Sequence, residues 1–394
     1  MRYSWTASVA LAALGATVLG PPPAVAQTAD YAYLGTYTRD APGGAGEAQS
    51  EGIYVASVDQ ESGELELIQT VPSDNPSFLA LSPDQRFLFA INEVADFEGE
   101  EAGSVEAYRI DEDSGEITLI NRQALPGPIP AHLAVDPSGE YLVVALYIGA
   151  SYVVLPIGED GSLGAPVDEV MQEGSGPNPQ RQEAPHPHAT TFDPAGRYIA
   201  TADLGIDKVE IFALEEGKLA KVSEVVMEPG AGPRHVAFNP DGTMLYVINE
   251  LNATITALPY DAESGKVGEP IATVATVPDD FLAAKSTAEI MVHPSGKFLY
   301  GSNRRFSDHP DADSIAVFRL GEQGVPERVQ LVTEDIAFPR AFQLDPTGTW
   351  LYALNQKGDS IVQFAIDQQT GELAPTGNIA EVPTPVSLVF TTSG

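Results

Sequence analysis

Alternating apolar and polar residues recur in short segments along the whole chain, and helical periodicity appears nowhere at useful length. Alternation with a period of two is typical of β-strands that bury one face. Pairs of these segments flank four-residue turns that have proline in the second position. The turn prolines are Pro83, Pro137, Pro194, Pro240, Pro294 and Pro346, with spacings of 54, 57, 46, 54 and 52 residues. A repeat of about fifty residues is typical of proteins that arrange equivalent units around an axis.

A second pattern, a strand followed by a polar turn and another strand, occurs seven times against six proline turns. Its copies begin at Gly52, Ser104, Ser151, Lys208, Thr254, Ser314 and Ser360. The two chain ends supply the seventh hairpin, because residues 31–37 have the pattern of a second strand and residues 385–390 that of a first. We therefore predict an all-β fold, a seven-bladed β-propeller of four-stranded antiparallel blades. It forms one domain, residues 29–394, and pairing of the N- and C-terminal strands closes the ring. An open solenoid is the competing arrangement, and the split blade argues against it.

Polar residues gather at one end of the predicted inner hairpins, opposite the proline turns. First strands start there at residues 77–78, 131–132, 188–189, 234–235, 288–289, 340–341 and 386–387. Second strands end there at residues 92–93, 146–147, 203–204, 249–250, 303–304, 355–356 and 36–37. Strand interiors are apolar, whereas these positions hold His, Arg, Glu, Asp, Asn and Gln. Because these ends face one side of the ring near its axis, we expect them to form one pocket.

The starts of the first strands and the ends of the second strands form two columns of residues. The residues of these two columns fall into two groups. We interpret the repeated Asn92, Asn249, Asn303 and Asn355 as caps of strand ends. We interpret the mixed set of scarce histidines, arginines and acids as a candidate site. His293, which replaces an Asp or Asn of a proline turn at the opposite end, is interpreted as structural. The candidate site residues are His132, His186, His188, Arg234, His235, Glu250, Glu289, Arg304, Arg340 and Gln356.

Charge and composition narrow the function classes. The formal net charge is −36, from 56 acidic and 20 basic residues, which argues against nucleic acid or an anionic membrane surface as partner. An anionic ligand would need a local cluster of arginines. There is no cysteine, hence no disulfide, thiol nucleophile or thiolate metal site. The sequence also lacks HExxH, GxSxG and P-loop motifs, and the spacing in His186-Pro187-His188 is not that of a zinc site, so we expect no metal or cofactor.

The first 26 residues have the pattern of a secretory signal peptide. A basic start at Arg2 precedes an apolar run from about residue 7 to residue 19, and Ala24-Val25-Ala26 forms a small-x-small cleavage site. The apolar run is shorter than the roughly 20 residues needed to span a bilayer. We therefore expect an exported protein, periplasmic or secreted, with no membrane insertion after the signal is removed.

Three stretches carry a resemblance to a known family. They run from Ala184 through the sequence PHPHATTFDPAGRYIATADLG, from Gly230 through AGPRHVAFNPDGTMLYVINEL, and from Ala288 through EIMVHPSGKFLYGSNR. The chain resembles the lactonase-type seven-bladed propeller family, which includes bacterial 6-phosphogluconolactonases and fungal carboxymuconate cyclases. The similarity extends over essentially the whole chain after the signal. Gly-Pro-Arg-His followed by Asn-Glu-Leu is its most specific part.

The resemblance implies an active site at one end of the central channel that acts on a small-molecule lactone. The family's histidine, arginine, glutamate and second arginine match His186 or His188, Arg234, Glu250 and Arg304. In a hydrolytic mechanism Glu250 or a histidine activates water. The two arginines stabilise the oxyanion.

Other residues of the columns are expected to bind the substrate. Arg340 and Gln356 would hold a carboxylate or phosphate, and His132, His235 and Glu289 complete the substrate-binding set. A phosphorylated lactone is cytosolic, so an exported member is expected to act on unphosphorylated sugar lactones or another cyclic ester. A non-enzymatic propeller that binds a ligand or partner, and a carboxymuconate-type lactonising enzyme, are the alternatives.

Overall fold

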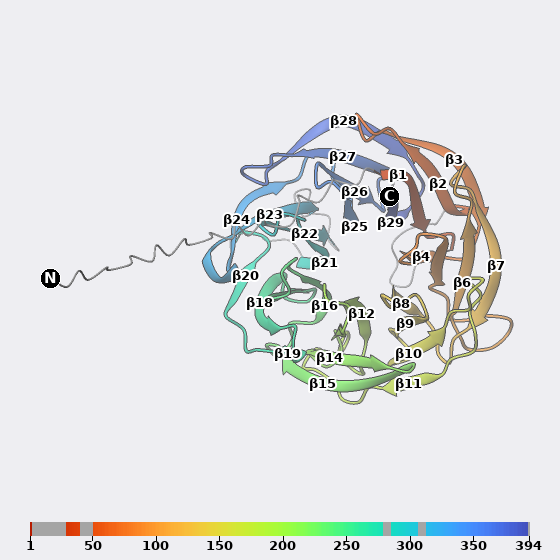
Figure 1. Ribbon diagram of the computed structural model, residues 1–394, viewed down its shortest axis with the longest axis horizontal. Coiled ribbons are helices and arrows are strands. Elements are labelled where there is room, and N and C mark those ends of the chain that lie inside the picture. Colours follow the sequence, from red (N-terminus) through yellow and green to blue (C-terminus); the bar gives the residue numbers. More distant parts are fainter. Residues whose placement is uncertain (2–28, 40–49, 279–284, 306–312, 393–394) are drawn as a thin grey trace.

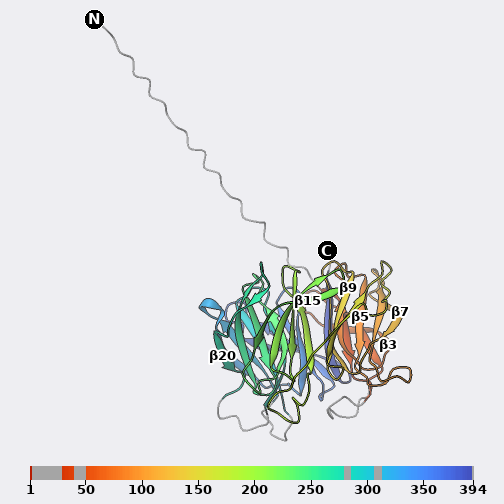
Figure 2. The same cartoon turned by 90° about the horizontal axis from the view of Figure 1, so that it is seen from below.

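The computed structural model describes Met1 and residues 29–39, 50–278, 285–305 and 313–392. Residues 2–26 of the predicted signal peptide therefore lie outside the described part. Seven antiparallel sheets are arranged around a central axis (Figure 1). Seen from the side, their strands run between the two faces of the disc (Figure 2). The predicted seven-bladed β-propeller is confirmed.

Each blade contains strands in four positions, from the axis outward. The innermost strands are β4 (Pro76–Leu81), β8 (Pro130–Val135), β12 (Pro187–Phe192), β16 (Pro233–Phe238), β21 (Lys285–Val292), β25 (Pro339–Leu344) and β29 (Pro385–Thr392). The second strands are β5 (Phe87–Asn92), β9 (Tyr141–Leu146), β13 (Tyr198–Asp203), β17 (Met244–Asn249), β22 (Phe298–Arg305), β26 (Trp350–Asn355) and β1 (Ala29–Thr36). The third strands are β6 (Ser104–Ile110), β10 (Ser151–Pro156), β14 (Lys208–Glu215), β18 (Thr254–Asp261), β23 (Ser314–Leu320), β27 (Ser360–Ile366) and β2 (Gly52–Val58).

The outer edge of the disc is less regular than its centre. The outer strands are β7 (Ile117–Ala124), β11 (Asp168–Met171), β15 (Lys218–Val226), β20 (Ala272–Ala275), β24 (Pro326–Val332), β28 (Leu373–Glu381) and β3 (Leu65–Pro72). In one blade β18 also pairs with the short β19 (Lys266–Val267). A single 3₁₀ turn, Glu322–Gly324, is the helical element of the described ranges. No helix in those ranges is long and apolar enough to cross a membrane.

The two chain ends close the ring as predicted. β1 pairs with β29 on one side and with β2 on the other, so one blade has the order β29-β1-β2-β3. In the closing ladder Tyr33 lies opposite Val389 and Leu34 opposite Leu388. Leu34 and Leu388 are buried with side chains of the preceding blade, such as Leu354. The closing blade is therefore packed into the ring like the others.

Local side-chain hydrogen bonds to the backbone stabilise the proline turns. In the turn 136–139, Asp136 accepts hydrogen bonds from the backbone N–H groups of Ser138 (3.1 Å) and Tyr141 (2.7 Å), and Gly139 has a φ of 76°. A positive φ favours glycine, and aspartate suits the start of such a turn. His293 replaces the aspartate in one copy. Its Nδ1 accepts from Ser295 N–H, and its Nε2 lies 2.8 Å from the carbonyl of Gly348 in the next blade's turn, which confirms its structural role.

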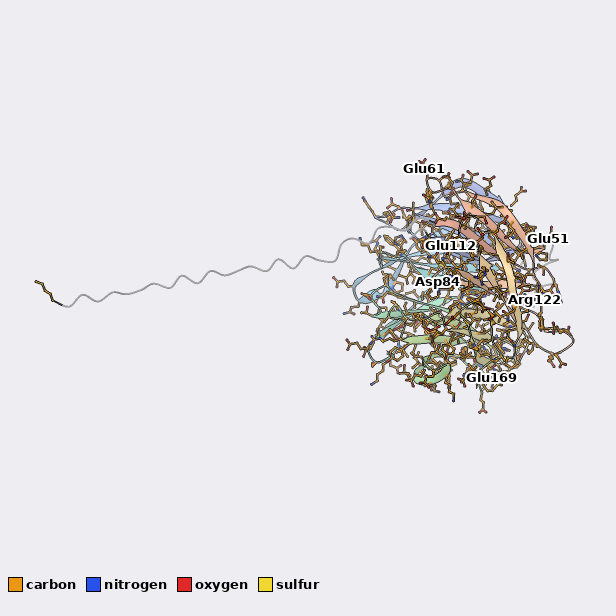
Figure 3. The ribbon with its side chains drawn as sticks, turned by 45° about the vertical axis from the view of Figure 1, so that its right-hand side comes forward. Glu51, Glu61, Asp84, Glu112, Arg122 and Glu169 are labelled. Carbon is orange, nitrogen blue, oxygen red and sulfur yellow. The ribbon has the colours of Figure 1, made fainter. Side chains whose placement is uncertain are left out.

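The surface carries the acidic excess of the sequence. Glu51, Glu61, Glu112 and Glu169 are exposed on the blades that face the viewer in Figure 3. With a net charge of −36, the protein as a whole repels anions. A cluster of arginines at one end of the channel therefore supplies positive charge locally.

Candidate functional site

The strand register brings the two polar columns together at one end of the inner hairpins. Its last pairs are Pro76 with Asn92, Pro130 with Leu146, Pro187 with Asp203, Pro233 with Asn249 and Pro339 with Asn355. In all five hairpins the register shifts just after the proline, as in a β-bulge. Bulges turn a side chain away from its regular direction, and they are common beside active sites.

A cavity of about 480 Å³ opens between these strand ends. Its lining residues are Tyr37, Glu93, Ile129, Ala131, Tyr147, Ile148, Gln180, Arg181, Glu183, His186, His188, Glu250, Arg304, Phe338, Arg340 and Gln356. Five of these residues directly follow a second strand, namely Tyr37, Glu93, Tyr147, Glu250 and Gln356, and Arg304 is the last residue but one of β22. The cavity is large enough for a monosaccharide-sized ligand.

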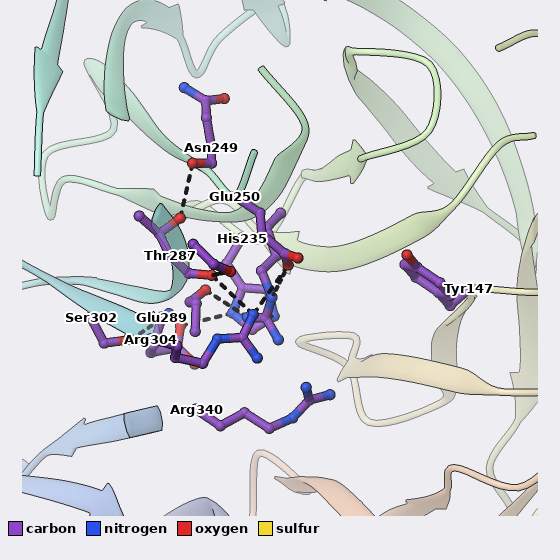
Figure 4. A network of polar contacts seen from close by, with 12 residues as sticks. Tyr147, His235, Asn249, Glu250, Thr287, Glu289, Ser302, Arg304 and Arg340 are labelled. Atoms are coloured by element: carbon purple, nitrogen blue, oxygen red, sulfur yellow. Dashed lines mark hydrogen bonds and ion pairs between the residues drawn. The ribbon is translucent and has the colours of Figure 1, made fainter. Parts of the chain in front are cut away.

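Glu250 binds three arginines. Arg181 Nη2 donates to Glu250 Oε1 at 2.7 Å, and Arg304 Nη2 donates to Oε2 at 3.2 Å. Arg234 Nε lies 3.1 Å from the same Oε2 as an ion pair, although its angle does not make it a hydrogen bond. Figure 4 shows Glu250, His235, Glu289 and Arg304 grouped together, with the Arg340 side chain beside them and Tyr147 set apart. The carboxylate is thus the centre of a buried charge network.

The arginines determine the protonation of this network. Burial alone would raise the pKa of Glu250, but Arg304, Arg181 and Arg234 outweigh it and lower this pKa to about 2. Burial and the neighbouring arginines lower the pKa of Arg234 to about 10 and that of Arg304 to about 9. All these groups are therefore charged near neutral pH.

A second acid–arginine group lies across the cavity. Tyr37 Oη donates to Glu93 Oε2 at 2.7 Å, and Arg340 Nη2 donates to the same oxygen at 3.3 Å. The Arg340 guanidinium also lies over the Tyr37 ring, 5.3 Å from its centroid. Its Nη2 is engaged by Glu93, whereas Nη1 and Nε have no hydrogen-bond partner within the described chain. Arg340 therefore presents donors to the cavity.

His186 and His188 have different surroundings. His186 stacks on Tyr147, with ring centroids 4.4 Å apart, and its Nδ1 lies 3.1 Å from the Tyr147 carbonyl oxygen. A carbonyl only accepts, so Nδ1 carries the proton. Its Nε2 lies 3.2 Å from Glu183 Oε1. His188 Nδ1 is buried and has no hydrogen-bond partner in the described ranges, and burial together with Arg234 and other positive neighbours lowers the pKa of His188 well below its usual value.

Of the ten predicted site residues, six line this cavity: His186, His188, Glu250, Arg304, Arg340 and Gln356. His132 and Glu289 line a different cavity of about 550 Å³, formed by the inner strands towards the proline turns. Arg234 and His235 line neither and are buried between the two. The bulges explain this split, because neighbouring residues of one strand face opposite halves of the channel.

The asparagine column is structural, as predicted. Asn92 Nδ2 donates to Asp74 O at 2.9 Å and its Oδ1 accepts from Ser104 Oγ at 2.7 Å. Asn355 accepts from Ala337 N and donates to Asp335 O. Each such amide ties the end of a second strand to neighbouring segments. These side chains hold the strand ends that carry the cavity residues.

Sequence reasoning missed several cavity residues. Tyr37, Glu93 and Tyr147 stood in the predicted columns but were not selected. Arg181 and Glu183 lie in the connection between β11 and β12, outside the columns. The available signal was length, because the interval from Pro137 to Pro194 is the longest of the six-turn series. A scarce arginine in the longest insertion was a reasonable candidate.

Comparison with known proteins places the chain in a family. The family described as lactonase, 7-bladed beta-propeller, matches residues 31–390. The chain belongs to this lactonase family. The resemblance stated from the sequence is confirmed over nearly all of the described residues.

Relatives and solved structures agree with this assignment. The chain is 38% identical to the 6-phosphogluconolactonase of Bacillus subtilis over 360 residues, which cover 91% of this chain and 97% of that protein. It is similar to the periplasmic gluconolactonase of Pseudomonas aeruginosa, with a TM-score of 0.82, 28% identity, and coverage of 92% of this chain and 98% of that one. A solved protein from Lactobacillus plantarum has the same TM-score of 0.82 at 32% identity, covering 92% and 99%.

Proposed function

We propose that this member of the lactonase family hydrolyses a sugar-type lactone to the open hydroxy acid in the cavity around Glu250. The relatives named as 6-phosphogluconolactonase and gluconolactonase support the reaction class. The observation that carries the proposal is the group of three arginines around one carboxylate, beside His186, at the wall of a 480 Å³ cavity. Such a positive cluster suits a reaction that develops an oxyanion.

His186 is the better candidate for the general base. A carboxylate whose pKa is held at about 2 has little tendency to take a proton, so Glu250 acts as the anchor of the arginines. The Nδ1 proton of His186 is directed at the Tyr147 carbonyl, so Nε2 is the nitrogen that exchanges a proton with water. Nε2 faces the Glu183 carboxylate, whose side chain is 55% exposed, and it acts as a base when Glu183 turns away and water takes its place. Glu183, at 3.2 Å from Nε2, holds the imidazolium once it has formed.

The proposed reaction has two steps. His186 Nε2 takes a proton from water while the water oxygen bonds to the lactone carbonyl carbon, and the carbonyl oxygen becomes an oxyanion beside Arg304 and Arg340. The oxyanion then reforms the carbonyl, the ring C–O bond breaks, and the leaving alkoxide takes the proton back from His186. Each donor to the oxyanion contributes typically a few kcal/mol to transition-state stabilisation.

Other residues that line the cavity bind the substrate in this proposal. Gln356 Oε1 is buried and has no hydrogen-bond partner in the described chain, so it is available to accept from a sugar hydroxyl. Arg340 directs free donors into the cavity from the other side. The rings of Tyr37, Tyr147 and Phe338 supply apolar faces for the carbon skeleton.

The proposed site of action is outside the cytoplasm, on an unphosphorylated lactone. The support is the signal-like pattern of residues 1–26 together with the periplasmic gluconolactonase among the similar structures. The carboxylates of Glu250, Glu93 and Glu183 balance three of the four positive charges of the site arginines, which leaves little positive charge for a phosphate group. An unphosphorylated substrate needs no further cation.

The test follows acid release from a panel of lactones. Purified protein is mixed with δ-gluconolactone and its 6-phosphorylated form in weak buffer, against the spontaneous rate. We expect acceleration by the wild type and a kcat at least about a hundredfold lower for Glu250→Gln, because the arginines lose their anchor. The matched control is Glu106→Gln, a buried glutamate bound to Arg122 and Tyr108 in another blade, which should keep full activity.

Three results would each overturn a part of the proposal. Absence of acceleration with every lactone of the panel would favour a binding propeller. Full activity of Glu250→Gln, with unchanged circular dichroism, would remove the site from the mechanism. Acceleration with the phosphorylated lactone alone would refute the unphosphorylated substrate.

A further inference from the structure

The guanidinium of Arg234 is buried, and groups on the side away from Glu250 orient it. Its side chain is only 2% exposed, and it is absent from the cavity lining although it contacts Glu250. Its Nη1 donates to the Ala288 carbonyl at 2.6 Å and lies 3.2 Å from His235 Nε2. The orientation of this guanidinium therefore depends on two groups on the side away from Glu250.

The contact with His235 fixes the proton on the imidazole ring. A guanidinium has donors and no acceptor, so His235 Nε2 must accept from Arg234 Nη1. The ring proton then sits on Nδ1, which lies 2.9 Å from Glu289 Oε1. The imidazole is neutral in this arrangement, and burial beside Arg234 lowers the pKa of His235 in agreement. The direction of each hydrogen bond in the chain is thus defined.

Glu289 is itself held in place by its own blade. Its Oε1 accepts from the backbone N–H of Ile290 at 3.0 Å, and its backbone N–H donates to Ser302 Oγ at 2.9 Å. Glu289 stands on β21 and His235 on β16, so the contact joins neighbouring blades. The other charged or titratable groups near Glu289 are His132, Arg234 and Arg340.

We infer that Glu289 and His235 are positioning residues that hold Arg234 against Glu250. They do not bind substrate, since Glu289 lines the other half of the channel and His235 lines neither cavity. The series of polar contacts runs from Glu289 through His235 and Arg234 to Glu250, with distances of 2.9, 3.2 and 3.1 Å. Figure 4 shows three of its members, Glu289, His235 and Glu250, in one group. The inference deepens the proposed lactonase function and rests on it for its kinetic consequence.

The kinetic test compares two substitutions of Glu289. Glu289→Leu removes the acceptor of the His235 proton, and we expect kcat to fall tenfold to a hundredfold, a range of about the size that a misplaced active-site group produces. KM should stay within about twofold, because no substrate contact is lost. Glu289→Gln keeps an acceptor oxygen and should retain kcat within about threefold. A rise in KM in either variant, with kcat unchanged, would instead assign substrate binding to Glu289.

A double-mutant cycle separates positioning from a general loss of structure. Arg234→Lys removes the group that the chain orients, so Glu289→Leu should reduce kcat no further in that background. Multiplying effects would overturn the inference. Glu106→Gln is the control, and its kcat should match the wild type.

A measurement without substrate keeps the inference separate from the lactonase proposal. In protein with ¹⁵N-labelled histidine, the His235 ring should show a protonated Nδ1 and an unprotonated Nε2, and Glu289→Leu should alter the Nδ1 signal. The opposite tautomer would refute the hydrogen-bond chain even if lactones are hydrolysed. The expected tautomer together with an inactive wild type would refute the lactonase function but would support the hydrogen bonds from Glu289 through His235 to Arg234.

Discussion

At the scale of single residues, the environment rather than the residue type decides the chemistry of the acids. Glu250 and Glu289 are both buried glutamates near the axis. Three arginines lower the pKa of Glu250 to about 2, whereas burial raises the pKa of Glu289 to about 7. The first is a permanent anion that anchors cations. The second accepts a hydrogen bond from a histidine and loses its charge as the pH falls through about 7.

Asp203, behind His186, is a further buried acid with a testable effect on stability. Its Oδ1 accepts from the backbone N–H groups of His186 (2.7 Å) and Gly205 (2.9 Å), while its Oδ2 has no hydrogen-bond partner in the described ranges. Burial is the main cause that raises the pKa of Asp203 to about 7; the nearby Glu210 also raises it, whereas the backbone hydrogen bonds lower it. The folded state therefore binds a proton that the unfolded state releases near pH 4.

We expect Asp203→Asn to stabilise the protein at pH 8 and not at pH 4. The raised pKa makes the wild type lose free energy of unfolding as pH rises from about 4 to 7, and an asparagine does not ionise. The gain at pH 8 should be roughly 2–4 kcal/mol, since each pKa unit corresponds to about 1.4 kcal/mol. Denaturant unfolding at both pH values measures it, with the exposed Asp96→Asn as control. An equal difference at pH 4 and pH 8 would contradict the assignment.

At the scale of secondary-structure elements, the long connection between β11 and β12 completes the site. It places Arg181, whose side chain is 38% exposed, against Glu250 and within 3.3 Å of Tyr147 Oη. The connection is anchored below by Gln182, which donates to Leu204 O and to Asp207. The backbone next to Arg181 is therefore fixed while the Arg181 side chain reaches over the cavity.

We expect Arg181→Ala to weaken substrate binding more than turnover. One of the three cations that lower the pKa of Glu250 is removed, and the cavity wall loses donors, so KM should rise roughly tenfold, or ~1.4 kcal/mol. The fall in kcat should stay below about threefold, because Arg304 and Arg340 remain. The control is Arg197→Ala, which loses a hydrogen bond to Ala262 O on the turn side. A larger effect on kcat than on KM would place Arg181 at the reacting atoms.

The elements also show what could be predicted from the sequence. Alternation, proline turns and the unequal count of two motifs defined the strands and the split blade, because these signals are local. The positions of the strand ends were also predictable, since strand ends follow from turn positions, but the expected single pocket is divided into two cavities. The direction of each side chain was not predictable, because it depends on the bulge: His188 is the bulged residue of its strand and lines one cavity, whereas His132 follows the bulge and lines the other. Arg181 was missed because a loop position follows from no repeat.

At the scale of the whole molecule, one ladder holds the ring together. The pairing of β1 with β29 joins residues that are more than 300 positions apart in the sequence. Every other blade is built from consecutive strands. Opening of the ring therefore begins most easily at this ladder, because there the chain connectivity does not limit separation.

A disulfide across this ladder should stabilise the protein. Ala29 and Thr392 are partners in the ladder, and the chain has no other cysteine to interfere. We expect oxidised Ala29→Cys/Thr392→Cys to gain about 2–4 kcal/mol over its reduced form, since it restricts the unfolded chain over a long loop. Thermal unfolding with and without reductant measures the gain.

The control is a disulfide between consecutive strands of one blade, which does not join the two ends of the propeller ring. Ala365→Cys/Ala374→Cys joins partners in the adjacent strands β27 and β28, and its short loop should give a smaller gain. Equal gains in the two double variants would show that unfolding does not begin at the β1–β29 ladder.

The position of β29 also sets an order in time. It is the innermost strand of its blade, yet it follows every other strand of the ring in the sequence, so β1, β2 and β3 wait for a partner while six other blades are synthesised. A shortened chain would leave the inner edge of β1 and a face of the neighbouring blades unpaired, which favours aggregation. The architecture thus distinguishes chains that contain β29 from chains that lack it, because β29 finishes the ring.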